Sequence, residues 1–333
     1  MKAAGQTRRG IWRWAVSFAL AGILLYVSLR GVDWGRVWRI IVTADWRWLL
    51  VSCAIMCFSF FLRSLRWRIL LNAEADLDVG LVFWATMAGY LGNNFLPARA
   101  GELVRTYFIS ARSALSKTYV LTTALSERSM DVIALVLWSS FLLLRVKPKP
   151  GWMESVSRTT AVIGVAAAVA IAILPHAGGL LERLLQRVPM PGLRQRLQHL
   201  MQEVLLGMRA FHDVRRFAGF GLFTAVIWTA DAFSTIAGAR GLGITMSFPV
   251  AMLLLAGLGL GSALPSTPGY VGIYQFVAVT VLVPFGINRD AALAYILVSQ
   301  ALSYVIVLLL GLPGWYRAPV SKAAPGGLEE LGR

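Results

Sequence analysis

GYLGNNFLPARAGELVRTYF at Gly89–Phe108 and GLGLGSALPSTPGYVGIYQF at Gly257–Phe276 align without a gap at an offset of 168 residues. The alignment places Leu96 and Pro97 on Leu264 and Pro265, and Gly101 on Gly269. A single Leu-Pro pair followed by a glycine is a weak signal in an apolar chain. Two copies, each at the polar centre of an otherwise apolar segment, indicate an internal repeat that decides the architecture.

Both stretches carry residues that interrupt a helix. Proline removes a backbone donor and clashes with the preceding turn, and glycine permits the dihedral angles needed to reverse the chain. A helix interrupted at bilayer depth survives only where protein or a polar cavity satisfies its freed backbone groups. Paired interrupted segments therefore mark a transporter's central site. We predict two re-entrant helical hairpins, 79–114 and 248–285, whose candidate site residues include Pro97, Gly101, Pro265, Pro268, Gly269 and Gly272.

Composition places the whole chain in the membrane. Of its 333 residues 57% are hydrophobic and only 14% are charged, with mean hydropathy +0.66, whereas a soluble domain is roughly a quarter charged. Apolar runs of nearly spanning length occur near 11–29, 46–62, 79–97, 118–144, 157–174, 216–237, 248–264, 268–285 and 290–313. We predict an all-α polytopic membrane protein with about six full spans and the two hairpins. Residues 1–316 form one transmembrane domain, its first helix uncleaved, and 317–333 a flexible tail.

The net charge of +16 does not indicate a nucleic-acid partner, because no basic soluble module carries it. Apart from Arg128, every lysine and arginine is expected in a loop or at the end of an apolar run. Segments 1–13, 63–78, 98–117, 178–216 and the tail after 313 hold 21 of them, and 30–47, 145–158, 237–247 and 286–289 hold 10. The positive-inside rule then places both termini in the cytoplasm, with the hairpins entering from opposite sides as an inverted repeat.

Two segments outside the spans show amphipathic spacing. Residues 178–213 predict two short amphipathic helices at the cytoplasmic interface. A shorter interfacial helix is expected within 33–45, where Trp34, Trp38 and Trp46 suit the headgroup region.

Charged residues inside the membrane are costly and usually pair or line a polar path. Glu102 and Arg105 are spaced i, i+3, close enough for an ion pair. Glu127 and Asp131 share a helix face, while Arg128 points about 100° away toward another partner. Asp231 is a further intramembrane acid without an evident partner. Asn93 and Asn94 precede the first break, where their amides can satisfy freed backbone groups.

Two interpretations of these charges remain open. In one, they neutralise each other and fasten helices together. In the other, Arg105 and Arg128 receive an anionic phosphate, because a guanidinium matches phosphate geometry and stays charged, and Glu102 and Glu127 orient the two arginines.

Catalytic and metal-binding patterns are not found in the sequence. The three histidines show no ligand spacing, and Cys53 and Cys57 are expected to be small buried hydrophobes. There is no nucleophile elbow and no phosphate-binding loop. We therefore expect neither an enzyme nor a bound metal or cofactor.

Three motifs in order, at Asn93–Arg105, Ser126–Asp131 and Leu264–Gly272, resemble the lysylphosphatidylglycerol synthase transmembrane region family over about residues 11–314. The family consists of flippase-like membrane proteins, free-standing or fused to a soluble enzyme domain. The resemblance implies that this chain is a free-standing form which carries lipids between leaflets.

Two departures from the family pattern concern the second hairpin. Relatives usually have a glycine where this chain has Tyr270 and a glutamate where it has Gln275. The last span usually carries an arginine where Gln300 stands. If relatives form an ion pair there, both partners have been neutralised together in this chain, as a buried pair would require.

The leading hypothesis is a lipid translocase for an anionic phospholipid or an isoprenoid- or hopanoid-type lipid in the cytoplasmic (inner) membrane. A proton-coupled secondary transporter that uses Glu102 or Glu127 is one alternative. An accessory subunit that works with a lipid-modifying enzyme is another. The expected partners are membrane lipids, and the oligomeric state is left open.

Overall fold

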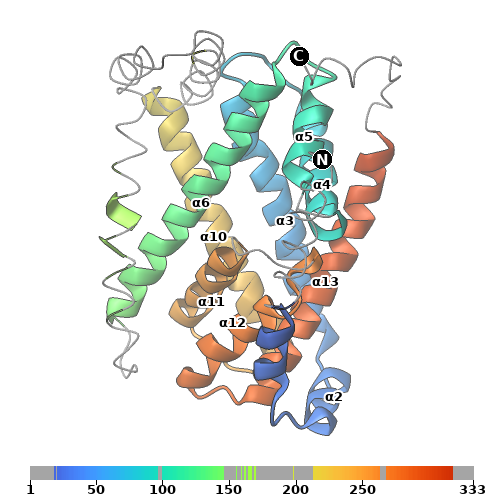
Figure 1. The fold of residues 1–333 in the computed structure, drawn as a ribbon, viewed down its shortest axis with the longest axis vertical. Helices are drawn as coiled ribbons and strands as arrows, with labels where there is room; N and C mark the ends of the chain where they lie inside the picture. Colours follow the sequence, from blue (N-terminus) through green and yellow to red (C-terminus); the bar gives the residue numbers. More distant parts are fainter. Residues whose placement is uncertain are drawn as a thin grey trace, which may run out of the picture.

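The chain is a bundle of helices in the computed structural model, which describes residues 21–96, 100–145, 213–262 and 268–317 and a few isolated residues. All regular secondary structure in these ranges is helical (Figure 1). The prediction of an all-α polytopic membrane protein is confirmed. Most of the predicted spans 11–29 and 157–174, the segment 178–213 and the tail after Arg317 lie outside the described residues, although 21–29 are helical.

Four long helices run from one end of the molecule to the other. They are α3 (Trp46–Leu71), α6 (Lys117–Arg145), α10 (Val214–Gly241) and α13 (Arg289–Tyr316). By length and composition α3, α10 and α13 are able to cross a membrane. The 29 residues of α6 rise about 43 Å, enough to cross as well, but charged residues interrupt its apolar sequence.

Two pairs of shorter helices occupy the positions of the predicted hairpins. The first pair is α4 (Val79–Phe95) and α5 (Gly101–Ser110). The second is α11 (Phe248–Gly261) and α12 (Ile273–Leu282), joined in part by the 3-10 turn η4 (Pro268–Tyr270) and followed by η5 (Val283–Phe285). The pairs enter the bundle from opposite ends, so that their tips approach each other at mid-height (Figure 1). Pro97 and Pro265 lie outside the described residues, and only the backbone of Pro268 is described.

The offset of 168 residues extends well beyond the hairpins. Added to the bounds of α3, it gives 214 and 239, and α10 begins at 214 and ends at 241. Added to the bounds of α6, it gives 285 and 313, and α13 covers 289–316. Because α3 and α10 run in opposite directions (Figure 1), helices α3–α6 and α10–α13 are two repeats of inverted orientation.

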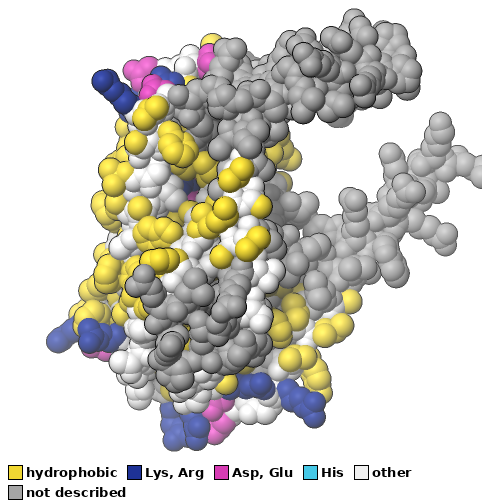
Figure 2. Space-filling model, turned by 90° about the vertical axis from the view of Figure 1, so that its left-hand side faces the viewer, with side chains coloured by type: hydrophobic (Ala, Val, Ile, Leu, Met, Phe, Trp, Pro, Cys, Tyr) yellow, Lys and Arg dark blue, Asp and Glu magenta, His cyan; other side chains and the backbone are white. Residues whose placement is uncertain are grey.

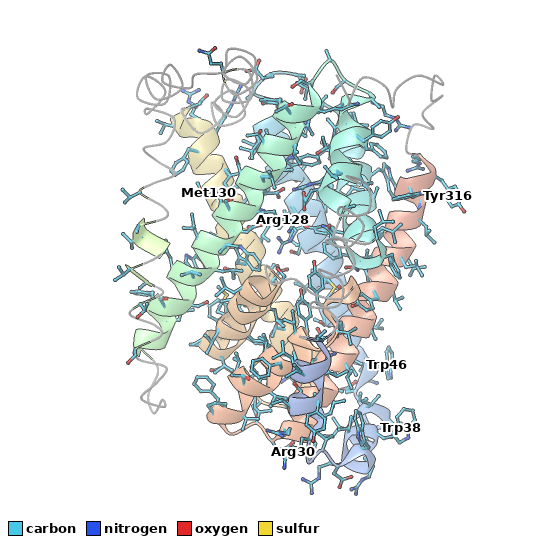
Figure 3. All side chains as sticks on the ribbon, in the orientation of Figure 1. Arg30, Trp38, Trp46, Arg128, Met130 and Tyr316 are labelled. Carbon is cyan, nitrogen blue, oxygen red and sulfur yellow. The ribbon has the colours of Figure 1, made fainter. Side chains whose placement is uncertain are left out.

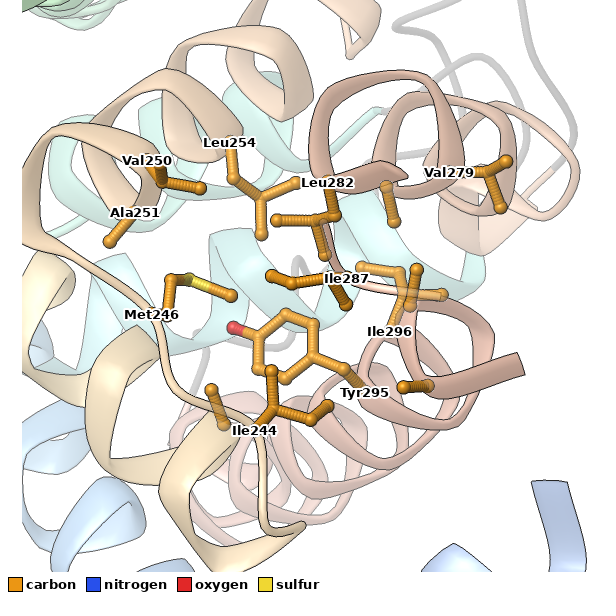
Figure 4. Packing of buried hydrophobic residues seen from close by; sticks show 14 of the residues in the cluster. Ile244, Met246, Val250, Ala251, Leu254, Val279, Leu282, Ile287, Tyr295 and Ile296 are labelled. Carbon is orange, nitrogen blue, oxygen red and sulfur yellow. The ribbon is translucent and has the colours of Figure 1, made fainter. Parts of the chain in front are cut away.

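Each repeat has its own hydrophobic core. In the first, the fully buried Trp67, Leu70 and Phe108 pack α3 against the hairpin α4–α5. In the second, Leu254, Leu282 and Tyr295 bring α11, α12 and α13 together (Figure 4). Each hairpin also packs against a long helix of the other repeat. Gly311 of α13 lies against Leu91 of α4, and Gly259 of α11 lies against Leu135 of α6.

The loops between helices lie at two opposite ends of the bundle, and charged side chains lie there as well. Loops 30–33, 43–45, 242–247 and 286–288 lie at one end, and 72–78 and 111–116 at the other (Figure 1). On the face that Figure 2 shows, charged side chains collect toward both ends, and many hydrophobic side chains lie between them. The grouping of these segments into two sides is the grouping that the charge count predicted.

Helix α2 (Trp34–Val42) corresponds to the short amphipathic helix expected within 33–45. Its Val37 is buried, while Trp34 and Trp38 are exposed, and the helix lies at one end of the bundle (Figure 3). Asp290, at the start of α13, accepts a hydrogen bond from the Asp33 amide at 3.1 Å and pairs with Arg36 at 3.5 Å. This contact fixes α2 against the second repeat.

Glycine allows the first hairpin to close tightly. A Cβ atom on Gly101 would overlap the carbonyl oxygen of Gly89 and the side chain of Asn93. The Gly101 amide donates to Asn93 Oδ1 at 3.0 Å. The start of α5 therefore packs directly on the backbone of α4.

We expect Gly101→Ala to separate α4 from α5 and to destabilise the protein by about 1–3 kcal/mol, the usual cost of overpacking. Gly221→Ala is the matched control, because a Cβ on this exposed residue of α10 meets no atom within 4 Å. The thermal unfolding midpoint in detergent measures both effects. Equal midpoints for the two variants would contradict the close packing of the hairpin.

Candidate functional site

Eight charged side chains from α3, α5, α6 and α10 form a connected group beside the first hairpin. We call this group the charged cluster; it consists of Arg63, Arg66, Glu102, Arg105, Glu127, Arg128, Asp131 and Asp231. Its members come from three of the four helices of the first repeat and from α10 of the second.

Arg66 is the centre of the charged cluster. Its side chain is 0% exposed and binds both carboxylate oxygens of Asp131, at 2.6 and 2.8 Å. It also donates to Glu127 Oε1 at 2.8 Å and to Thr224 Oγ1 at 3.0 Å. A planar guanidinium with several donors suits such a two-pronged contact, so that Arg66 joins α3 to α6 and α10.

Arg105 carries the network into the hairpin. Its Nη1 donates to Glu127 Oε2 at 2.8 Å and its Nη2 to the Ala124 carbonyl at 3.1 Å. Its Nε contacts Glu102, and the guanidinium lies over the Trp67 ring. The predicted ion pair between Glu102 and Arg105 is confirmed. Of the two arginines expected to receive a phosphate, Arg105 is the buried one, and its donors face protein groups.

Asp231 has a partner that sequence reasoning did not identify. Arg63 on α3 forms an ion pair with Asp231 on α10 and lies 3.7 Å from Asp131. Its guanidinium also covers the ring of Trp228, whose Nε1 donates to Asp131 at 3.2 Å. Three buried arginines, Arg63, Arg66 and Arg105, therefore lie inside helices. The expectation that Arg128 alone departs from loops and run ends was wrong.

Arg128 forms the accessible edge of the charged cluster. Its Nε donates to Glu102 Oε1 at 3.0 Å, and its guanidinium lies over the Tyr90 ring of α4. Its side chain is 37% exposed and that of Glu102 is 18% exposed. As predicted from the helical angle, Arg128 pairs with Glu102, whereas Glu127 and Asp131 pair with other arginines. Figure 3 shows where Arg128 lies in the bundle.

Asparagine supports the tip of the first hairpin as the sequence predicted. Asn93 accepts from the Gly101 amide and places its Nδ2 3.4 Å from Glu102 Oε1. It thereby connects the backbone at the break to the charged cluster. Asn94 is half-buried beside it.

The second hairpin is held by amides in place of charges. Gln275 Oε1 accepts from the Gly272 amide at 2.7 Å, and its Nε2 donates to Gln300 Oε1 at 2.9 Å. Gln300 Nε2 in turn donates to the Gly269 carbonyl at 2.5 Å, which also accepts from the Tyr304 hydroxyl. The two glutamines that were expected to depart from the family pattern are thus direct partners. They join α12 to α13 as Arg105 and Glu127 join α5 to α6.

Backbone conformation explains the glycines at this tip. Gly269 and Gly272 have φ angles of +74° and +89°, in the region that favours glycine. Tyr270 also has a positive φ of 62°, and it stands where the family pattern is expected to have a glycine. Its ring stacks on that of Tyr274 with centroids 4.7 Å apart. Such a conformation costs a tyrosine about 1–3 kcal/mol.

These features define a class of protein: an integral membrane protein with two opposed hairpins and a buried ionic cluster beside the first of them. The family model described as the lysylphosphatidylglycerol synthase TM region matches residues 14–311. The chain belongs to this family, as the sequence motifs indicated.

Two relatives that match nearly the full chain are named membrane proteins. A UPF0104 membrane protein of Pyrococcus horikoshii is 24% identical, over 87% of this chain and 92% of that protein. One from Methanothermobacter thermautotrophicus is 22% identical, over 88% of this chain and 90% of the relative. The glycosyltransferase AglD of Haloferax volcanii is 22% identical over 88% of this chain, but the match covers only 51% of AglD.

We expect Arg66→Met to be severely destabilising, because it leaves Asp131 and Glu127 with too few buried partners. Removal of one member of a buried ionic network costs about 3–5 kcal/mol. The measurement is the yield of folded, monodisperse protein in detergent and its thermal midpoint. Arg215→Met on the exposed start of α10 is the control and should behave as the unmodified protein. A fully stable Arg66→Met protein would show that the network is not structural.

We expect Gln275→Glu and Gln300→Arg each to lower the thermal midpoint, and the double variant to recover most of the loss. Each single change buries one charge at the Gln275–Gln300 contact, whereas the double change creates an ion pair. A double-mutant cycle isolates this coupling. Losses that simply add in the double variant would contradict the pairing.

Proposed function

We propose that the protein moves a lipid between the two leaflets, its headgroup passing the hairpin tips while its acyl chains stay in the bilayer. The observation that carries the proposal is the charged cluster beside the first hairpin, which offers one half-exposed cation, Arg128, at depth in an apolar bundle. A polar headgroup needs such a partner to enter the apolar region. Membership of a lipid-related membrane family supports the same role, and in this proposal the chain catalyses no reaction.

The charged cluster favours lipid transport over proton coupling. Each carboxylate of the cluster contacts at least one arginine, and Glu102, Glu127 and Asp131 each contact two. A proton carrier must accept a proton and release it. Protonation of any of these acids would leave buried guanidinium charge without its counter-ion, which is costly in an apolar medium.

The charge count supports an orientation in the cytoplasmic membrane. Arg63, Arg66 and Arg105 are buried within helices and so drop out of the segments assigned to the inside. Their removal leaves 18 lysines and arginines on that side against 10 on the other. The bias keeps its direction, and we propose that the end with loops 72–78 and 111–116 faces the cytoplasm.

We expect Arg128→Ala to reduce leaflet exchange of phospholipid in proteoliposomes at least tenfold, because a charge-assisted hydrogen bond contributes about 1.5–3 kcal/mol. Exchange is followed by dithionite quenching of lipids labelled on the acyl chain. Arg128→Lys keeps the charge and should retain part of the rate, and Arg215→Ala should retain all of it.

The outcome that would overturn the proposal is leaflet exchange by the unmodified protein no faster than in protein-free liposomes, for every phospholipid tested. An Arg128→Ala protein that inserts normally and exchanges lipid at the unmodified rate would remove Arg128 from the path.

A further inference from the structure

The net charge of the eight side chains in the charged cluster is zero. Four arginines face four carboxylates, and all eight are joined by ion pairs within 4 Å. In an apolar medium an uncompensated charge is costly, whereas a neutral group of paired charges is tolerated. The net charge of a headgroup that binds at this edge is therefore not compensated by the charged cluster, whose own net charge is zero.

The hydrogen-bond donors of the cluster are unequally occupied. Both amino nitrogens of Arg66 and of Arg105 donate to protein oxygens, and those of Arg63 face Asp231 and Asp131. Arg128 uses only its Nε, toward Glu102. Within the described part of the chain, no acceptor contacts either of its amino nitrogens. Arg128 therefore has the open guanidinium edge, which matches the oxygens of one phosphate.

The accessible edge also presents an anion. Glu102 lies beside Arg128, and its side chain is 18% exposed. Asn93 and Arg105 hold this carboxylate from the protein side. A ligand that approaches the edge thus meets a guanidinium and a carboxylate as immediate neighbours, and a purely anionic group placed on Arg128 would also face the charge of Glu102.

We propose that this edge selects a zwitterionic phosphodiester headgroup, whose phosphate binds Arg128 and whose ammonium group lies against Glu102. The inference rests on the proposed lipid transport and names its substrate class. It differs from the sequence-based expectation of an anionic phospholipid or an isoprenoid- or hopanoid-type lipid. Arg105, which that expectation placed on a phosphate together with Arg128, uses its amino nitrogens on Glu127 and Ala124. Phosphocholine and phosphoethanolamine lipids have the required chemistry; a phosphomonoester or a phosphoglycerol headgroup lacks the compensating cation.

Leaflet exchange of four lipids with the same labelled acyl chain tests this selectivity. Phosphatidylcholine, phosphatidylethanolamine, phosphatidylglycerol and phosphatidic acid are each added in trace amount to otherwise identical proteoliposomes. We expect the two zwitterionic lipids to exchange at least tenfold faster than the two anionic ones. Equal rates for all four, or faster anionic lipids, would overturn the selectivity and leave lipid transport standing. No exchange of any lipid would overturn both.

The Glu102→Gln variant distinguishes a role of Glu102 in headgroup recognition from a purely structural role. The substitution leaves the cluster with one surplus positive charge, so the ratio of phosphatidylglycerol to phosphatidylcholine exchange should rise at least tenfold. Arg215→Gln, at the exposed start of α10, should leave the ratio unchanged. A Glu102→Gln protein that slows all four lipids equally would show a purely structural carboxylate and contradict the inference. If this variant does not fold, the comparison of the four lipids with the unmodified protein still tests the inference.

Discussion

The two amino nitrogens of the buried Arg66 guanidinium donate to oxygens from two other helices, α6 and α10. Asp131 and Glu127 come from α6, Thr224 comes from α10, and Glu127 is shared with Arg105 of the hairpin. A buried arginine in an apolar bundle is costly unless carboxylates pair with it. Because Arg105 of α5 and Arg66 of α3 share Glu127, the position of α5 depends on this contact. The hairpin cannot shift relative to α3 and α6 without breaking it.

The two repeats use the same mechanical link with different chemistry. In each, the second helix of the hairpin is joined to the following long helix by a buried side-chain pair, Arg105 with Glu127 in one and Gln275 with Gln300 in the other. An amide pair keeps the geometry at a lower desolvation cost than an ion pair, but it offers a headgroup only dipoles. The backbone is nearly symmetric about the offset of 168 residues, whereas the electrostatic field at the two hairpin tips is not.

The sequence contained enough local signal to predict the hairpins and the first ion pair. Helix-breaking residues, the repeat and the i, i+3 spacing of Glu102 and Arg105 are all visible within about twenty residues. Arg63 and Arg66 were missed because the apolar run stops at Leu62, although α3 continues to Leu71 and ends only at its cap Asn72. No glycine or proline interrupts that helix, which was the available sign that the arginines lie inside it. Their partners come from α6 and α10, and only tertiary packing brings these helices to α3.

Arg63 and Asp231 differ by 168 residues, the offset that relates the two repeats. Each is therefore the repeat equivalent of the other, and two equivalent residues in contact must lie close to the axis that relates the repeats. The remaining ion pairs of the charged cluster lie within the first repeat, so they hold α3, α5 and α6 together as one body. Among the described residues, Arg63–Asp231 is the only ion pair that joins one four-helix repeat to the other. A change that exchanged the conformations of the two repeats would leave a contact on the axis in place while the hairpins moved around it. The pair therefore lies where such a change would displace it least.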